Sequence, residues 1–168
     1  MHNLNESFAG MRILSLVSKQ SSYREVYKAQ TPKGEMVYLI VYDNHNSRAL
    51  MDKGKMREFV MLSDLTNAAF PKPIKIGSLS YRGRTMSYMS AKHFDGVTLR
   101  ALMGGRPLVV RVAVNIALQV MAAVRDLTAY TNGGGHYNLN PDTVIVSRVE
   151  GGVFVHLGGL DHVSSPCS

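Results

Sequence analysis

The first ninety residues alternate between apolar and polar positions in short runs, which is the period expected of β-strands. These runs cover residues 12–17, 24–30, 36–42, 74–79 and 84–91. Turn residues separate the second run from the third at Thr31-Pro32-Lys33-Gly34, and the fourth from the fifth at Tyr81-Arg82-Gly83. Residues 47–65 carry a partial apolar stripe and predict one helix, which Gly54 weakens. We therefore expect a five-stranded antiparallel sheet with one helix after the third strand.

The second part of the chain changes to helical spacing. Thr98 is placed to cap a short helix over residues 99–103, which Gly104-Gly105 ends. Pro107 opens a long helix that runs to about Tyr130, and its apolar residues occupy most of its circumference, which predicts a buried central helix. Residues 144–147 and 153–157 predict a small β-hairpin. The expected class is α+β.

Composition and charge narrow the class of protein. The 168 residues are 45% hydrophobic and 18% charged, which is typical of a globular protein with a core. The formal net charge is +7, but the basic residues are scattered and form no block of five or six, which argues against nucleic-acid binding. No run approaches the roughly 18 apolar residues of a membrane span. The single cysteine, Cys167, excludes a disulfide framework, so we expect a cytoplasmic protein without membrane contact.

Residues 136–146 read His-Tyr-Asn-Leu-Asn-Pro-Asp-Thr-Val-Ile-Val, and they resemble the catalytic loop of a protein kinase, usually read HRDLKPxNILV. Further segments resemble kinase motifs in the kinase order: residues 25–29 (EVYKA), 34–41 (the strand with the lysine), 57–62 (the regulatory helix) and 94–99 (the end of the interlobe hinge). The resemblance covers about residues 10–165. It implies a protein kinase-like fold, with an N-lobe over residues 1–93 and a partial C-lobe over residues 94–168.

The resemblance also implies that the catalytic positions have been replaced. Neutral residues stand at the lysine, the base, the phosphate-contacting lysine, the metal asparagine and the metal aspartate: Ile40, Asn138, Asn140, Thr143 and Gly159. An isoleucine carries no charge, and an amide accepts no proton at neutral pH. A register shifted by two residues would make Asp161 the metal ligand, but it would stand without a base or a second ligand. We expect no catalysis, no metal and no cofactor.

The remaining cleft positions predict a poor nucleotide site. The three glycine positions of the phosphate-covering loop, aligned on Val26, hold Lys19, Ser21 and Arg24, whose side chains would crowd the phosphates. Tyr38 stands where a small residue faces adenine, and its phenol is expected to fill part of the pocket. Glu58 matches the glutamate of the regulatory helix but has lost its lysine. We therefore expect Glu58 to face solvent or to pair with another cation.

The leading hypothesis is a catalytically inactive kinase-like domain, a pseudokinase, that acts as a protein-interaction or regulatory module in signalling. One alternative is a nucleotide- or anion-binding domain without catalysis, with Lys19 and Arg24 binding the anion. A further alternative is a basic nucleic-acid-binding module. The expected partner is another protein or a fused downstream domain, and the apolar helix over residues 107–130 also predicts a homodimer.

Histidines and the loop residues around them have structural expectations. His136, His156 and His162 lack a recognisable ligand spacing for a metal site. In the kinases that the loop resembles, the matching histidine is a structural residue of the core, so the resemblance implies that His136 and Leu139 serve packing.

Overall fold

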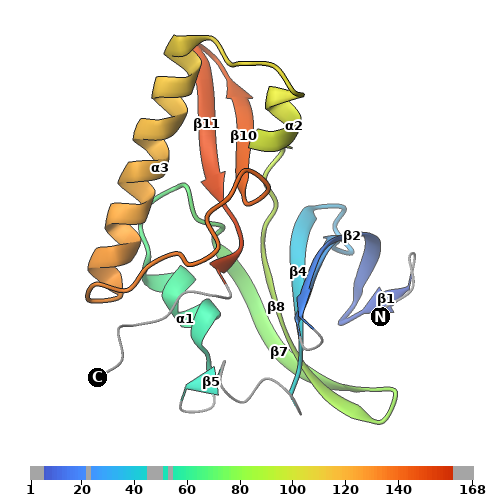
Figure 1. Cartoon of the computed structure of the whole chain (residues 1–168). Coiled ribbons are helices and arrows are strands. Elements are labelled where there is room, and N and C mark those ends of the chain that lie inside the picture. Colours follow the sequence, from blue (N-terminus) through green and yellow to red (C-terminus); the bar gives the residue numbers. More distant parts are fainter. Residues whose placement is uncertain (1–5, 22–23, 45–50, 53–54, 161–168) are drawn as a thin grey trace. The chain divides into compact units, whose positions relative to one another are not determined.

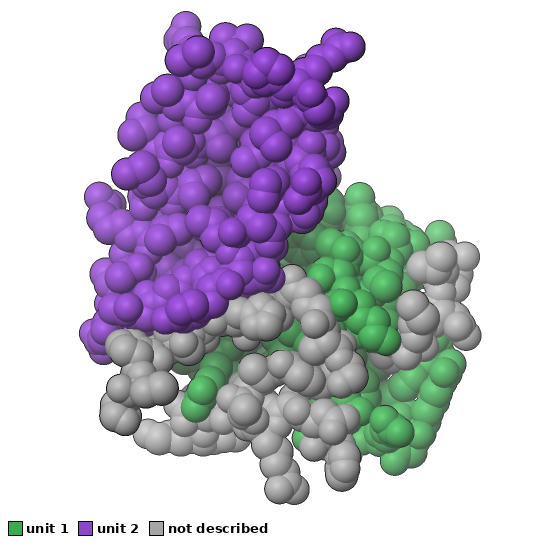
Figure 2. Space-filling model, in the orientation of Figure 1, with its two compact units in different colours: residues 1–60, 72–93 green, residues 61–71, 94–168 purple. Residues whose placement is uncertain are grey.

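The computed structural model describes residues 6–21, 24–44, 51–52 and 55–160 (Figure 1). The chain divides into two compact units (Figure 2). Unit 1 comprises residues 1–60 and 72–93, and unit 2 comprises residues 61–71 and 94–168. Three residues that entered the sequence hypotheses, Asp161, His162 and Cys167, lie outside the described residues.

Unit 1 is built on one antiparallel sheet with the strand order β1-β2-β3-β4-β8-β7. The strands are β1 (Ser7–Phe8), β2 (Met11–Ser21), β3 (Arg24–Gln30), β4 (Met36–Asp43), β7 (Pro73–Tyr81) and β8 (Arg84–Lys92). Each of the five predicted runs forms a strand. The sheet has six strands because β1, too short to show a sequence period, pairs with the start of β2.

Strand β4 is buried on both faces, so it separates two packed layers. Side chains alternate along a strand, and Val37, Leu39 and Val41 face one layer. They pack there in an apolar cluster with residues of neighbouring strands: Phe8, Met11, Ile13, Tyr27, Ala29 and Tyr88. The alternate residues of β4 face the opposite layer.

The helix that begins in unit 1 and ends in unit 2 is shorter than the sequence predicts. The structure has α1 only over Arg57–Asp64, and the residues before it pair as two short strands, β5 (Met51–Asp52) and β6 (Lys55–Met56). The remaining positions of the predicted helix before residue 55 lie outside the described residues. The predicted helix was too long because the prediction gave the apolar stripe more weight than Gly54. A glycine inside a helix is about 1 kcal/mol less favourable than an alanine.

Besides the end of α1, unit 2 combines two further helices with a three-stranded sheet of order β11-β10-β9. Its elements are β9 (Val97–Thr98), α2 (Leu99–Met103), α3 (Val110–Tyr130), β10 (Val144–Val149) and β11 (Gly152–Leu157). The predicted cap of α2 is present, because the Ala101 N–H donates to the Thr98 hydroxyl at 3.1 Å. Gly104 ends α2 in the left-handed conformation, with φ of 51°. The predicted hairpin gains a third strand, β9.

Helix α3 is not the buried central helix that the sequence predicts. Its fully buried residues are Ile116, Ala123 and Leu127, which share one face. Gln119 joins the helix to β11: its amide donates to the Val153 carbonyl and accepts from the Val155 N–H, both at 3.0 Å. A two-stranded hairpin covers only one side of a helix, and an apolar pattern does not reveal how many sides are covered.

The other face of α3 carries large aliphatic side chains that remain in solvent. They follow one another at spacings of three and four residues and are between 51% and 76% exposed: Val110, Val114, Leu118 and Met121. The helix also differs from the sequence expectation about membrane spans. By length and composition alone, α3 could cross a membrane, and it is the one helix among the described residues that meets this test. Its side-chain bonds to β11 give it a packed place within unit 2, and the absence of membrane contact stays a prediction.

Candidate functional site

Glu58, at the position of the regulatory-helix glutamate, forms a buried ion pair with Arg24. Glu58 is only 9% exposed, and Arg24, at the start of β3, is 3% exposed. The Arg24 guanidinium donates to both carboxylate oxygens of Glu58, at 2.9 Å and 3.2 Å. The Tyr42 hydroxyl donates to the same carboxylate. Of the two outcomes expected for Glu58, pairing with another cation is correct and exposure to solvent is wrong.

The strand register explains why this pair forms. Arg24 lies directly opposite Tyr42 in the β3–β4 ladder, so both side chains leave the same face of the sheet toward α1. Burial, together with the neighbouring Glu58 carboxylate, raises the pKa of the Tyr42 hydroxyl well above its ordinary value. The phenol therefore remains a donor at neutral pH. Three buried polar groups hold α1 on the sheet without any lysine from β4.

Lys19 belongs to a separate ion pair on the opposite face. It faces Glu25 across the β2–β3 ladder, and its ammonium lies 3.3 Å from the carboxylate. Burial raises the pKa of Glu25, but the hydrogen bonds from Tyr27 and Lys19 outweigh it, so the carboxyl titrates below its ordinary value. Because Arg24 and Glu25 are consecutive in a strand, they point to opposite faces. The structure therefore does not bring Lys19 and Arg24 together as an anion site.

The lysine position itself has apolar neighbours in the sheet. Ile40 is 4% exposed and stands between Val26 of β3 and Met89 of β8 in the sheet. Two residues earlier, Tyr38 is 9% exposed, and its ring lies 4.7 Å from that of His93. Both side chains leave the sheet on the same face as Tyr42. At the positions that the resemblance assigns to adenine and to the phosphate-binding lysine, this face carries a phenol and an aliphatic side chain, beside the buried ion pair of Arg24 and Glu58.

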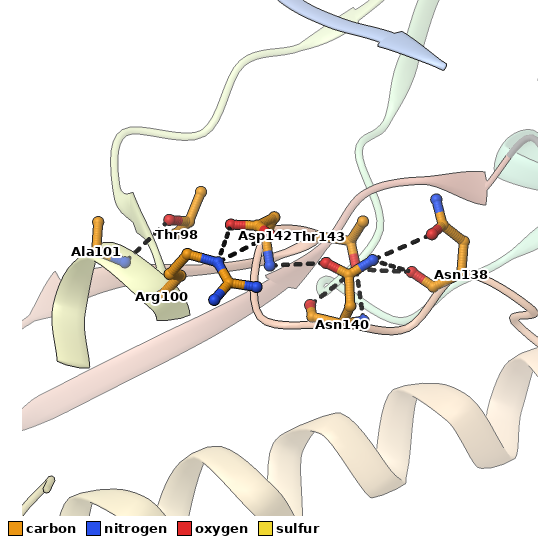
Figure 3. A network of polar contacts seen from close by, with 7 residues as sticks. All are labelled: Thr98, Arg100, Ala101, Asn138, Asn140, Asp142 and Thr143. Carbon is orange, nitrogen blue, oxygen red and sulfur yellow. Dashed lines mark hydrogen bonds and ion pairs between the residues drawn. The ribbon is translucent and has the colours of Figure 1, made fainter. Parts of the chain in front are cut away.

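In unit 2, the residues at the catalytic-loop positions bond to one another (Figure 3). The Asn140 side-chain amide donates to the side-chain oxygen and to the carbonyl of Asn138, both at 3.1 Å. The Thr143 hydroxyl accepts from the Asn140 N–H and lies 3.0 Å from the carbonyls of Asn138 and Asn140. The hydroxyl can donate to only one of them at a time. The polar side chains of Asn138, Asn140 and Thr143 thus form their hydrogen bonds within the turn that leads into β10.

The same turn is tied to α2. Figure 3 shows Arg100 reaching Asp142, and its Nε lies 2.8 Å and 3.0 Å from the two carboxylate oxygens. The Arg100 N–H also donates to the Pro141 carbonyl at 3.0 Å. The Asp142 N–H donates in turn to the Asn140 side chain at 2.8 Å. The sequence did not single out Arg100 or Asp142, since the link joins segments more than forty residues apart and leaves no local pattern.

Gly159, at the position of the metal aspartate, has no room for a side chain. Its φ is +73°, in the left-handed region that strains other residues. A Cβ added there would lie 2.8 Å from the Thr143 Cγ2 and 3.1 Å from the Asn138 Nδ2. A side chain at Gly159 would therefore crowd two of the other replaced positions of unit 2, Thr143 and Asn138.

The histidines have structural surroundings. His136 is 6% exposed, and its Nε2 lies 2.8 Å from the Gly158 carbonyl, which joins the loop to the segment after β11. His156 stacks on Phe94 with ring centroids 3.6 Å apart. No group of three or more potential metal ligands occurs among the described residues. Leu139, expected to pack, is 44% exposed, so that expectation was wrong.

No protein-family model matches the sequence, and a comparison with curated proteins also finds no match. Solved structures do match. A single-substitution variant of the PknI kinase domain of Mycobacterium tuberculosis shares 21% identity and a TM-score of 0.63, over 99% of this chain and 66% of that one. A double variant and a further structure of the same domain give TM-scores of 0.60 and 0.58, over 94% of this chain and 62% of each.

These comparisons establish the fold. The chain has a protein kinase-like fold, as the ordered motifs predicted, and it spans between 62% and 66% of the length of those kinase domains.

Proposed function

We propose that this chain is a catalytically inactive, kinase-like module that works by binding another protein. The observation that carries the proposal is the pairing of Glu58 with Arg24 and Tyr42. In active kinases this glutamate positions a lysine that binds the phosphates. Here the carboxylate already has three close donor bonds, and the lysine position holds a buried isoleucine.

The replaced residues of unit 2 support the same proposal. Phosphoryl transfer depends on a base that orients the nucleophile and on metal ions that neutralise the phosphate charge. The amides and the hydroxyl at these positions bond to one another. None of them carries a charge that could hold Mg²⁺ between phosphates.

We expect that Mg-ATP at millimolar concentration leaves the unfolding temperature of the purified chain unchanged within about 1 °C. A ligand present at 100 times its dissociation constant would add about 2.7 kcal/mol of stability, or roughly 5 °C or more for a protein of this size. Differential scanning fluorimetry measures this directly, with an ATP-binding protein kinase as the positive control. A reproducible shift of several degrees, or transfer of labelled phosphate to a generic acceptor protein, would contradict the proposal.

The two alternative functions have less support. The anion-binding alternative required Lys19 and Arg24 to act together, but each is paired with a different acid. For the nucleic-acid alternative, a steep loss of oligonucleotide affinity with rising salt would be the signature. The exposed apolar surface described above favours a protein partner instead.

The exposed face of α3 supports the predicted homodimer, because a second copy would remove the four aliphatic side chains from water. We expect Leu118→Glu to shift the chain toward the monomer in sedimentation velocity. Val149→Glu, which places the same charge on another half-exposed aliphatic position of unit 2, serves as the matched control. A wild-type chain that remains monomeric at high concentration would refute the homodimer.

A further inference from the structure

Strand β7 presents a long and regular outer edge. It is the last strand of the sheet, it pairs only with β8 among the described residues, and it spans nine residues. Its register with β8 is unbroken from Lys75 to Tyr81. In Figure 1, β7 and β8 form the long green hairpin of unit 1. The backbone groups of alternate β7 residues point away from β8, and such groups form a template for a further strand.

The opposite end of the sheet is protected in a way that β7 is not. There, β1 covers only two residues of β2, and the ladder of β2 with β3 is interrupted by three register shifts. Bulges of this kind twist an edge and prevent the addition of another strand. The edge of β7 carries one such shift, between Pro73 and Lys75, and is regular beyond it.

Charge is concentrated on the same unit. Unit 1 contains fourteen basic and six acidic residues, which gives a formal charge of +8. Unit 2 contains five basic and six acidic residues, which gives a formal charge of −1. Between Asp64 and Asp95 there is no acidic residue. Of the five basic residues in that interval, Arg82 and Arg84 are paired with acids from elsewhere in unit 1. The other three basic residues are Lys72, Lys75 and Lys92.

These lysines gather at one end of β7. Lys75 lies opposite Ser90 in the ladder, and Lys92 follows two residues later on β8, so both side chains leave the same face of the sheet. Lys72 is held beside them, since the Lys92 N–H donates to its carbonyl at 2.8 Å. All three residues are exposed. An acidic side chain on this face of an added strand would have more than one lysine within reach.

The other face of the same edge is apolar. Ile76 lies opposite Met89 and is 39% exposed, and Ile74, at the register shift, is 59% exposed. Near the start of β7, therefore, a basic and an aliphatic side chain stand on opposite faces of the strand, at Lys75 and Ile76. This is the period of a strand, and it matches a partner strand whose own side chains alternate in the same way.

We propose that β7 binds an extended segment of a partner protein in which acidic and aliphatic residues alternate, added as a seventh strand to the sheet of unit 1. Main-chain hydrogen bonds to the open edge would supply affinity. The acids would face Lys75 and Lys92, and the aliphatic residues would pack on Ile74 and Ile76. The inference rests on the proposed role as an interaction module and names the surface and the chemistry of its partner.

Two other occupants fit less well. A second copy pairing through β7 would bring the lysine clusters of the two copies onto one joined sheet, and like charges in neighbouring strands are destabilising. Nucleic acid would meet the lysines, but it would gain nothing from the exposed isoleucines and would not pair with the backbone edge. Both occupants are outcomes that the experiment can return.

The test uses capped synthetic peptides of nine residues, the length of β7, carrying a fluorescent label for anisotropy titrations. One peptide alternates glutamate and valine, and a second contains the same residues as one block of each. We expect the alternating peptide to bind at least about tenfold more tightly than the block peptide, because only alternation places acids and aliphatic groups on opposite faces. Equal binding of the two would overturn the inference.

Backbone pairing has its own signature. N-methylation of every second residue removes the N–H groups from one edge of the peptide, and the opposite phase removes them from the other edge. Strand addition predicts that one phase abolishes binding and the other leaves it nearly intact. Similar affinity for both phases would mean that the peptide does not bind as a strand.

Variants locate the surface. Lys75→Glu and Ile76→Ser are each expected to weaken the alternating peptide about tenfold. Lys33→Glu, the same charge reversal in the exposed β3–β4 turn, is the matched control and is expected to leave the affinity unchanged. Three results would each overturn the inference. They are unchanged peptide binding in both β7 variants, tighter binding of a single-stranded oligonucleotide than of the peptide, and self-association that is lost in Ile76→Ser. The Mg-ATP titration tests the absence of nucleotide chemistry separately, so failure here leaves the proposed function standing.

Discussion

Replacement of Arg24 by methionine is expected to lower the free energy of unfolding of unit 1 by about 3–5 kcal/mol. The substitution leaves Glu58 buried without its cation, and an unpaired buried carboxylate is far more costly than the loss of a surface contact. Urea denaturation followed by circular dichroism measures the change. The effect arises from the charge left behind, more than from any net stability of the ion pair.

A double-mutant cycle separates these two contributions. With Glu58→Leu added to Arg24→Met, neither charge remains and the cost of the unpaired charge should be recovered. The Tyr42 hydroxyl, which loses both partners, should leave a residual cost of about 1–3 kcal/mol. Lys19→Met is the matched control, since it breaks the half-exposed pair with Glu25 on the opposite face and is expected to cost at most about 1 kcal/mol. Equal losses from Arg24→Met and Lys19→Met would show that the buried pair does not hold α1 on the sheet.

Restoring the metal aspartate is expected to damage the protein without returning activity. Gly159→Asp places a side chain at a φ of +73°, with its Cβ 2.8 Å from the Thr143 methyl carbon. The left-handed backbone costs about 1–2 kcal/mol and the crowding a further 1–3 kcal/mol. We expect unit 2 to lose roughly 2–5 kcal/mol in a denaturant titration.

The neighbouring glycine is the control. Gly158 has no such backbone constraint, and a Cβ there would lie 3.7 Å from the Thr143 carbonyl, an ordinary contact. Gly158→Ala should therefore cost much less than Gly159→Ala. Adding Ile40→Lys and Asn138→Asp to Gly159→Asp should still give no phosphoryl transfer from labelled ATP, because the introduced lysine would find Glu58 already bound by Arg24. Measurable transfer by this triple variant would contradict the expectation.

The sequence predicted most of the fold because β3, β4 and β8 have one or both faces buried, which leaves a clear period of two or an unbroken apolar run. The cap and the end of α2 were also predictable, because Thr98 and Gly104 each act within one helical turn. The predicted helix began too early, before residue 57, because an apolar stripe does not reveal that Met51 and Asp52 pair with Met56 and Lys55. In each of these cases, the prediction followed from residues that are close together in the sequence.

The candidate site was less accessible, since its contacts join distant segments. Glu58 was predicted to need a cation, but the identity of that cation depends on the register that sets Arg24 opposite Tyr42. Similarly, the glycine at position 159 was read as a lost aspartate, and its left-handed backbone and its contact with Thr143 appear only in the fold. Sequence patterns identify which groups are missing, whereas the structure identifies what has taken their place.

The link between Gln119 and β11 has a consequence for synthesis on the ribosome. Helix α3 is complete before the chain reaches Val153 and Val155, which cover its buried face. At roughly 5–20 residues per second, the interval is about one to five seconds. During that time the buried face of the nascent helix lacks its cover, so aliphatic side chains are exposed on two faces and can bind a chaperone. Slow codons placed after Tyr130 would lengthen this exposure and lower the yield of folded protein.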